Sequence, residues 1–222
     1  MSLPSAKLLI LRGNDPSRIK EELDLLKAQL GDESIASMNI TVFDGDKVTL
    51  EELRAACLTM PFLAEYRLVI LEKARQYLAK INKASEEKVK EFLEDLPETS
   101  CLALLVEDDL VIRRKERVWV NAKAYQWLID WVHEASGRGK VVNCELPTDS
   151  EMPHWILKKV QTLEGAMEPA AAHVLASYLG NDTLRAGHEI EKLLNYTGGK
   201  RPVTAQDVIL LTAQNLEGDI FE

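Results

Sequence analysis

The chain has 222 residues, of which 46% are hydrophobic and 28% charged, and its formal net charge is −9. This composition predicts one or two packed domains of roughly 150 residues each. The negative charge argues against a protein that holds nucleic acid by overall electrostatic attraction alone. No apolar run approaches the roughly 20 residues of a membrane span, and the three cysteines lie far apart, so we expect buried thiols in a cytoplasmic protein.

Residues 1–146 alternate short apolar runs with amphipathic stretches. The apolar runs predict five buried strands, at residues 7–11, 39–43, 68–71, 102–106 and 141–142. Leucine spacing and helix-start residues predict helices at residues 15–30, 51–58, 83–96 and 116–135. Strands that alternate with helices imply an α/β domain with an open, parallel five-stranded sheet and flanking helices on both faces.

The pattern changes after residue 146, where strand signals end. Apolar spacing, proline and glycine positions predict helices at residues 153–163, 169–179, 182–196 and 204–212. We therefore expect a small all-α helical bundle at residues 147–215. We also expect residues 216–222 to begin a linker to a domain that the chain lacks.

The connection at residues 59–67, between a predicted helix and a predicted strand, is unusually apolar. Met60, Phe62 and Leu63 lie close together in it, and Pro61 stops the preceding helix. Connections are normally polar because they run through water. Such side chains either fold back onto the core or bind another protein, and the pattern alone favours the core.

A sheet followed by a helical bundle is the layout of AAA+ ATPases, so an ATP site is the first chemistry to test. The first strand should lead into G-x-x-x-x-G-K-[ST], but it leads into Arg12-Gly13-Asn14-Asp15, without the second glycine or the lysine. We therefore expect no tight ATP binding. The strand at residues 102–106 ends in Glu107, Asp108 and Asp109, which we interpret as exposed strand-end residues rather than a Mg²⁺ site.

Other candidate sites find little support in the sequence. The histidines lie in separate predicted helices and show no zinc-ligand spacing: His133, His154, His173 and His188. The densest basic cluster could touch a phosphate backbone, although a solvated surface patch is the commoner role: Arg113, Arg114, Lys115 and Arg117. The four tryptophans fit helix packing better than base stacking: Trp119, Trp127, Trp131 and Trp155. We predict no catalytic, cofactor or metal residues.

With ATP chemistry absent from an AAA+-like layout, the chain resembles the delta subunits of bacterial DNA polymerase III, the clamp-opening members of replicative clamp loaders. The likeness spans nearly the whole chain. It lies in LLILRGNDP at 8–16, TMPFLAEYRLV at 59–69, MPHWI at 152–156, and residues 180–193, 196–199 and 203–208. The chain departs from the family pattern at residues 118–131, which look longer and more aromatic, and in lacking the C-terminal collar domain.

The resemblance implies a non-catalytic, cofactor-free subunit that binds and opens the sliding clamp (the beta subunit) for loading onto primed DNA during replication. Its complex would include other clamp-loader subunits and have DNA-directed DNA polymerase (nucleotidyltransferase) activity. Met60, Phe62 and Leu63 match the family's clamp contact, which reverses the core interpretation above. Two alternatives stay open: a divergent Mg²⁺-dependent nucleotide-binding phosphotransferase using residues 107–109, and a generic AAA+-derived adaptor with another partner.

Overall fold

The computed structural model describes residues 6–113, 116–134, 137 and 139–218. It divides into two compact units, Met1–Glu145 and Leu146–Glu222. None of the helices in the described part of the chain is both long and apolar enough to cross a bilayer.

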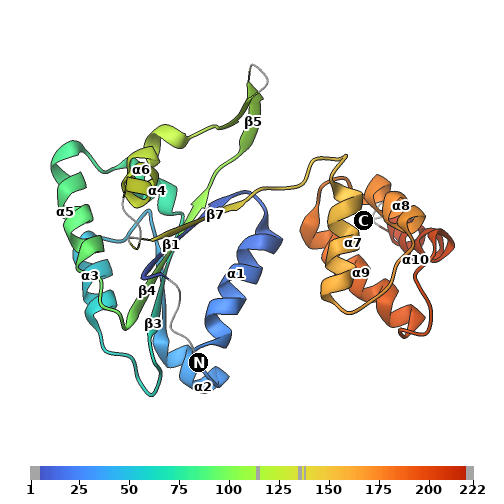
Figure 1. The fold of residues 1–222 in the computed structure, drawn as a ribbon, viewed down its shortest axis with the longest axis horizontal. Coiled ribbons are helices and arrows are strands. Elements are labelled where there is room, and N and C mark those ends of the chain that lie inside the picture. The colour runs from blue at the N-terminus through green and yellow to red at the C-terminus, as the bar shows by residue number, and fades with distance from the viewer. Residues whose placement is uncertain (1–5, 114–115, 135–136, 138, 219–222) are drawn as a thin grey trace. The chain divides into compact units, whose positions relative to one another are not determined.

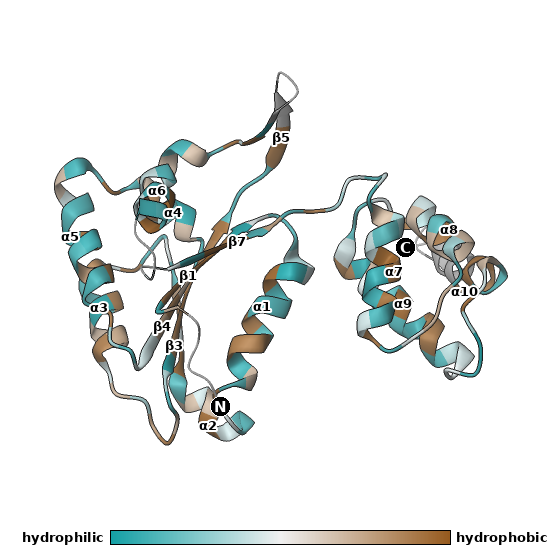
Figure 2. Ribbon diagram, in the orientation of Figure 1, coloured by the Kyte–Doolittle hydropathy of each residue, from teal (hydrophilic) through white to brown (hydrophobic). Residues whose placement is uncertain are grey.

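The first unit is built on a sheet of five parallel strands with the order β2-β3-β4-β1-β7, so this prediction is confirmed. The strands are β1 (Leu8–Gly13), β2 (Ile40–Asp44), β3 (Arg67–Glu72), β4 (Ser100–Glu107) and β7 (Lys140–Cys144). The helices are α1 (Pro16–Ala28), α2 (Glu33–Asn39), α3 (Leu50–Leu58), α4 (Ala74–Ala79), α5 (Lys83–Glu94) and α6 (Gln126–Glu134). The apolar runs along β1, β3 and β4 are visible as brown strands in the middle of the unit (Figure 2).

Helices cover both faces of this sheet, as its continuous apolar strands require. On one face, Leu26 of α1 and Ala36 of α2 pack in one cluster with Leu11 of β1. On the opposite face the helical contribution comes from α3, α4, α5 and α6: Leu53, Leu78, Phe92 and Leu128. Figure 1 shows α1 and α2 on one side of the strands and α3, α5 and α6 on the other. All three cysteines are free and buried, and burial raises the pKa of Cys57 to about 11.

The predicted helix at residues 116–135 is wrong in its first half. Those residues begin with β6 (Glu116–Trp119), which pairs antiparallel with β5 (Leu110–Arg113), and α6 starts only at Gln126. Two contacts favour the hairpin. The Val120 N–H donates to Asp109 O at 3.0 Å, and the Arg12 guanidinium lies 4.6 Å from the Trp119 ring centroid. Val118 and Trp119 also have high β propensity, which a search for helical spacing does not weigh.

The second unit consists of α7 (Met152–Thr162), α8 (Pro169–Leu179), α9 (Thr183–Thr197) and α10 (Ala205–Gly218). The first three lie within one residue of the predicted ranges, but α10 continues to Gly218, six residues beyond its predicted end and into the segment expected to be a linker. Their apolar faces form one core, with Ile156, Leu175 and Ile190 fully buried. The start of α10 is fixed by Asp207, whose carboxylate accepts from the Thr204 backbone N–H at 2.8 Å.

We expect the Asp207 carboxylate to make the stability of the second unit depend on pH in the acidic range. It accepts two hydrogen bonds from the Arg201 guanidinium, at 2.6 and 2.8 Å, and these bonds with the Thr204 contacts hold the pKa of Asp207 below its usual value. Because the folded-state pKa lies below the unfolded one, about 3.9, the stabilisation is present above that pH and is lost as the pH falls through the folded-state pKa. We expect Asp207→Asn to lower the melting temperature at pH 7, with the difference shrinking below about pH 4. Asp149→Asn, at an exposed position in the same unit, should change the melting temperature at neither pH.

Candidate functional site

The loop between α3 and β3 displays its apolar side chains on the surface. Met60 is 80% exposed, Phe62 53% and Leu63 76%. These three residues therefore do not fasten the loop to the core. Because the loop enters β3 at its first residue, it lies at the edge of the sheet formed by the amino ends of the parallel strands.

Residues on either side of Met60, Phe62 and Leu63 attach the loop to the rest of the sheet unit. α3 ends at Leu58, and its C-cap Thr59 donates its hydroxyl to Ala55 O at 2.8 Å, while Pro61 cannot continue a helix. Tyr66 then returns to the interior, where its side chain is buried and its hydroxyl donates to Leu26 O of α1 at 2.5 Å. Burial raises the pKa of the Tyr66 phenol, which keeps it a neutral donor. The loop is thus tied down at both ends while its middle faces solvent.

Two further features fix the backbone in the middle of the loop. The side-chain amide of buried Asn39, the last residue of α2, bonds both the N–H and the C=O of Phe62 at 2.7 Å. The next residue, Leu63, has a φ of 51°, in the left-handed region, which costs a branched side chain roughly 1 kcal/mol. Such a conformation persists only where its surroundings enforce it. Phe62 and Leu63 therefore sit on a fixed backbone.

The loop after β1, where a nucleotide phosphate would bind, is filled by contacts within the protein. The backbone N–H groups of Asn14 and Asp15 both donate to Cys144 O of β7, at 3.0 and 2.9 Å. Gly13 has a φ of 145°, and a Cβ added there would lie 1.9 Å from the same oxygen. The amides that would wrap a phosphate are thus engaged by β7.

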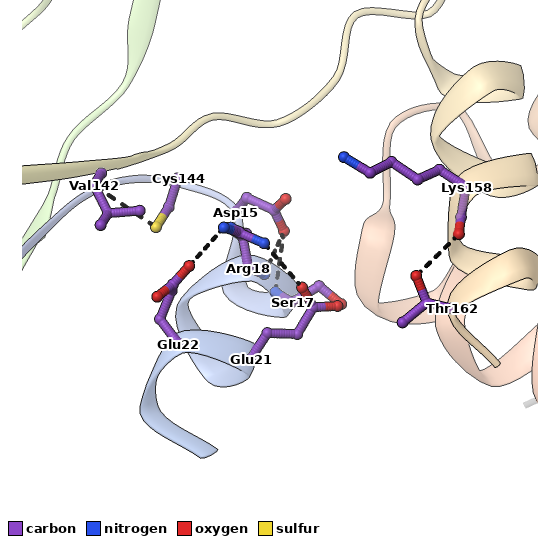
Figure 3. Close-up of polar contacts among 9 residues, drawn as sticks. All are labelled: Asp15, Ser17, Arg18, Glu21, Glu22, Val142, Cys144, Lys158 and Thr162. Atoms are coloured by element: carbon purple, nitrogen blue, oxygen red, sulfur yellow. Dashed lines mark hydrogen bonds and ion pairs between the residues drawn. The ribbon is translucent and has the colours of Figure 1, made fainter. Parts of the chain in front are cut away.

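The amino end of α1 is also occupied. The Asp15 carboxylate accepts from the backbone N–H groups of Ser17 and Arg18, at 3.0 and 3.2 Å (Figure 3). Arg18, in the first turn of α1, pairs with Glu21 and Glu22 of its own helix (Figure 3). A negative side chain therefore stands at the position where helix N-termini bind anions.

The acidic residues after β4 are held in structural contacts. Glu107 and Asp109 are exposed as predicted, but the prediction is wrong for Asp108, which is buried. Asp108 accepts from the Tyr125 hydroxyl at 2.5 Å and from the Asn121 side chain at 2.8 Å, and these bonds compensate for its burial. Asp109 accepts from the Asn14 side chain at 3.1 Å. These residues border a hollow of about 420 Å³ beside Gly13. Among the described residues, no three His, Cys, Asp or Glu side chains group so as to hold a metal ion.

The basic cluster is described only in part. Arg114 and Lys115 lie outside the described residues, and Arg113 ends β5. Arg117 of β6 pairs with Glu145 at 3.3 Å. Nothing in the structure tests a DNA contact by these four residues, so it stays a prediction.

The tryptophans have mixed surroundings. Trp131 of α6 is buried in the sheet core and Trp155 of α7 packs against the core of the second unit. Trp127 lies 5.9 Å from the Lys90 ammonium, and Trp119 covers Arg12. The predicted packing role therefore fits these residues, although Trp119 lies in a strand.

The sheet unit, Met1–Glu145, is similar to a known protein family. A family model described as DNA polymerase III, delta subunit, matches residues 9–144, which is nearly the whole sheet unit. The chain belongs to the DNA polymerase III delta-subunit family. The predicted resemblance is thereby confirmed.

Members of this delta family align with the second unit as well. The curated DNA polymerase III subunit delta of Bacillus subtilis (strain 168) is 23% identical over 216 residues, covering 96% of this chain and 58% of that protein. The solved structure of the Bacillus subtilis DNA clamp loader delta protein (YqeN) has a TM-score of 0.67 at 19% identity, covering 92% of this chain and 57% of that one. The chain thus spans a little over half the length of these relatives. The shared fold confirms the predicted parallel five-stranded sheet followed by a helical bundle.

The structure assigns positions that the sequence analysis missed. Asn39 falls at the start of a predicted strand, and nothing in its neighbourhood indicated that it would bond Phe62, 23 residues away. Asp15 caps the helix predicted at residues 15–30, but the sequence did not show that its backbone N–H would be engaged by Cys144 O of β7.

Proposed function

We propose that this chain is a non-catalytic clamp-loader subunit that binds a sliding clamp through Met60, Phe62 and Leu63 and opens the ring for loading onto primed DNA. The observation that carries the proposal is the pair of exposed apolar side chains, Phe62 and Leu63, on a backbone held by buried residues. Delta-family membership supplies the kind of partner.

The energetics suit an anchor of this kind. Burying an apolar side chain of this size in a partner's pocket gives roughly 1.5–3 kcal/mol before the costs of binding. A few central apolar anchors usually carry most of an interface's affinity. Because the Phe62 backbone is already fixed, less ordering is needed on binding.

Opening the ring requires more than affinity. A ligand shifts a conformational equilibrium only by binding one state more tightly than another. The subunit must therefore prefer the opened clamp, while sister subunits supply the ATP-driven changes.

The first test is direct binding of the unmodified chain to a purified sliding clamp, with a fluorescence pair across one clamp interface to report opening. Saturable binding with loss of energy transfer supports the proposal. Binding without a change in energy transfer would show that the chain binds the clamp but does not open the ring. Failure to bind at micromolar concentrations would contradict the proposal as a whole.

A thermal-shift experiment separates this function from the phosphotransferase alternative. Because Asp15 and Cys144 already engage the loop amides, we expect millimolar ATP with Mg²⁺ to leave the melting temperature unchanged. A ligand at a hundred times its Kd would add about 2.7 kcal/mol of stability, so tight binding would be seen easily. A clear rise in melting temperature would favour the enzyme.

A further inference from the structure

Asn39 makes more hydrogen bonds than it needs to cap the end of its own helix. Its side chain is fully buried. Its Nδ2 donates to Ile35 O at 2.9 Å, which completes its own helix, and to Phe62 O at 2.7 Å. Its Oδ1 accepts from the Phe62 N–H, also at 2.7 Å. The amide thus bonds both polar groups of one residue in a distant loop.

These two bonds are the hydrogen bonds that the backbone of residues 60–65 makes in the described structure. A carboxamide has a donor and an acceptor side by side, as a peptide unit has, so it can pair with a backbone as a neighbouring strand would. The loop carries no secondary structure of its own. Asn39 therefore supplies the order that a strand partner would otherwise provide.

We propose that Asn39 is a positioning residue for clamp binding, which fixes the Phe62 backbone so that Phe62 and Leu63 are held ready for the partner. This inference rests on the proposed function. Asn39 is buried and does not reach the partner itself. Its effect on affinity comes from ordering the loop before binding, which reduces the entropy lost in the complex.

The test is a double-mutant cycle on clamp affinity. Asn39→Ala removes both bonds to Phe62, and we expect it to weaken binding about tenfold, which corresponds to about 1.4 kcal/mol. In the background Phe62→Ala with Leu63→Ala, the same substitution should change affinity less than twofold, because the side chains that it positions are gone. A purely structural role for Asn39 would weaken binding equally in both backgrounds.

Asn121→Ala serves as the matched control. The Asn121 side chain also donates to a partner distant in sequence, Asp108, at 2.8 Å, but near the carboxyl ends of the strands. Its loss should lower the melting temperature without changing clamp affinity. If Asn121→Ala weakens binding as much as Asn39→Ala does, general destabilisation explains both and the inference fails.

The two proposals fail in distinguishable ways. If removing the Phe62 and Leu63 side chains leaves binding unchanged, the proposed function fails. If that pair weakens binding and Asn39→Ala does not, only the positioning role fails.

A measurement on the unmodified chain covers the case in which Asn39→Ala does not fold. The Phe62 amide should exchange with deuterium at least tenfold more slowly than the Leu63 amide, because only the former donates to a buried oxygen in the structure. Equal exchange at the two amides would overturn the inference.

Discussion

Phe62→Ala with Leu63→Ala is expected to weaken binding to a sliding clamp by about a hundredfold or more. The two side chains are 53% and 76% exposed in the chain alone, and their loss removes roughly 3 kcal/mol of burial from the complex, near two decades in Kd. The measurement is the Kd by surface plasmon resonance or fluorescence anisotropy. The far-ultraviolet circular dichroism spectrum should stay unchanged, because neither side chain is part of a core cluster.

The control for this pair is Ile209→Ala with Leu210→Ala. These residues are also adjacent and apolar, with exposures of 49% and 50%, but they lie on α10 of the second unit. Clamp affinity should be unaffected by this pair. Equal weakening by both pairs would indicate non-specific apolar contact, and an unfolded Phe62 and Leu63 double variant would show that these residues stabilise the fold.

Gly13→Ala is expected to cost at least about 3 kcal/mol of unfolding free energy. A Cβ at Gly13 would lie 1.9 Å from Cys144 O, and the φ of 145° is one that L side chains rarely adopt. Relief would require β1 and β7 to separate at their carboxyl ends, where Cys144 O also binds the amides of Asn14 and Asp15. Urea denaturation followed by circular dichroism measures the loss.

Gly187→Ala is the matched substitution for this experiment. Gly187 lies inside α9, and a Cβ there would meet no atom within 4 Å. Alanine should leave stability unchanged or raise it, since glycine costs roughly 1 kcal/mol within a helix. A Gly13→Ala variant as stable as the unmodified chain would mean that the approach of Cys144 to the loop is not rigid.

The sheet could be predicted because its central strands are buried on both faces. Residues 8–11 and 102–106 are continuous apolar runs, and in the structure Leu8 to Leu11 pair with Leu102 to Leu105 in register. The first helix was equally clear, since Asp15 and Pro16 are typical of a helix start and both take those positions. These signals are local and strong.

The misses have two physical causes, which are dependence on contacts far along the chain and the short length of some elements. The β5–β6 hairpin contacts Arg12, more than 100 residues away, and α6 follows it so closely that helical spacing seemed to run through both. The helices α2 and α4 have only seven and six residues, too short for a periodic pattern to emerge.

The candidate site divides in the same way. The sequence alone shows that residues 60–63 are apolar and that the phosphate-loop lysine is absent. Whether those side chains face solvent was not, because Tyr66 and Asn39 decide it through bonds to Leu26 and Phe62. Single hydrogen bonds between residues far apart in the chain produce no repeating pattern in the sequence.

The parallel arrangement of the strands has a practical consequence. Residues 59–66 and the loop after β1 lie at opposite edges of the sheet, separated by six-residue strands such as β1, roughly 20 Å long. A dye or a surface tether attached at exposed Glu107 would thus stay clear of a bound partner. The chain can be immobilised at the carboxyl ends of the strands while residues 59–66 at the amino ends remain exposed for binding.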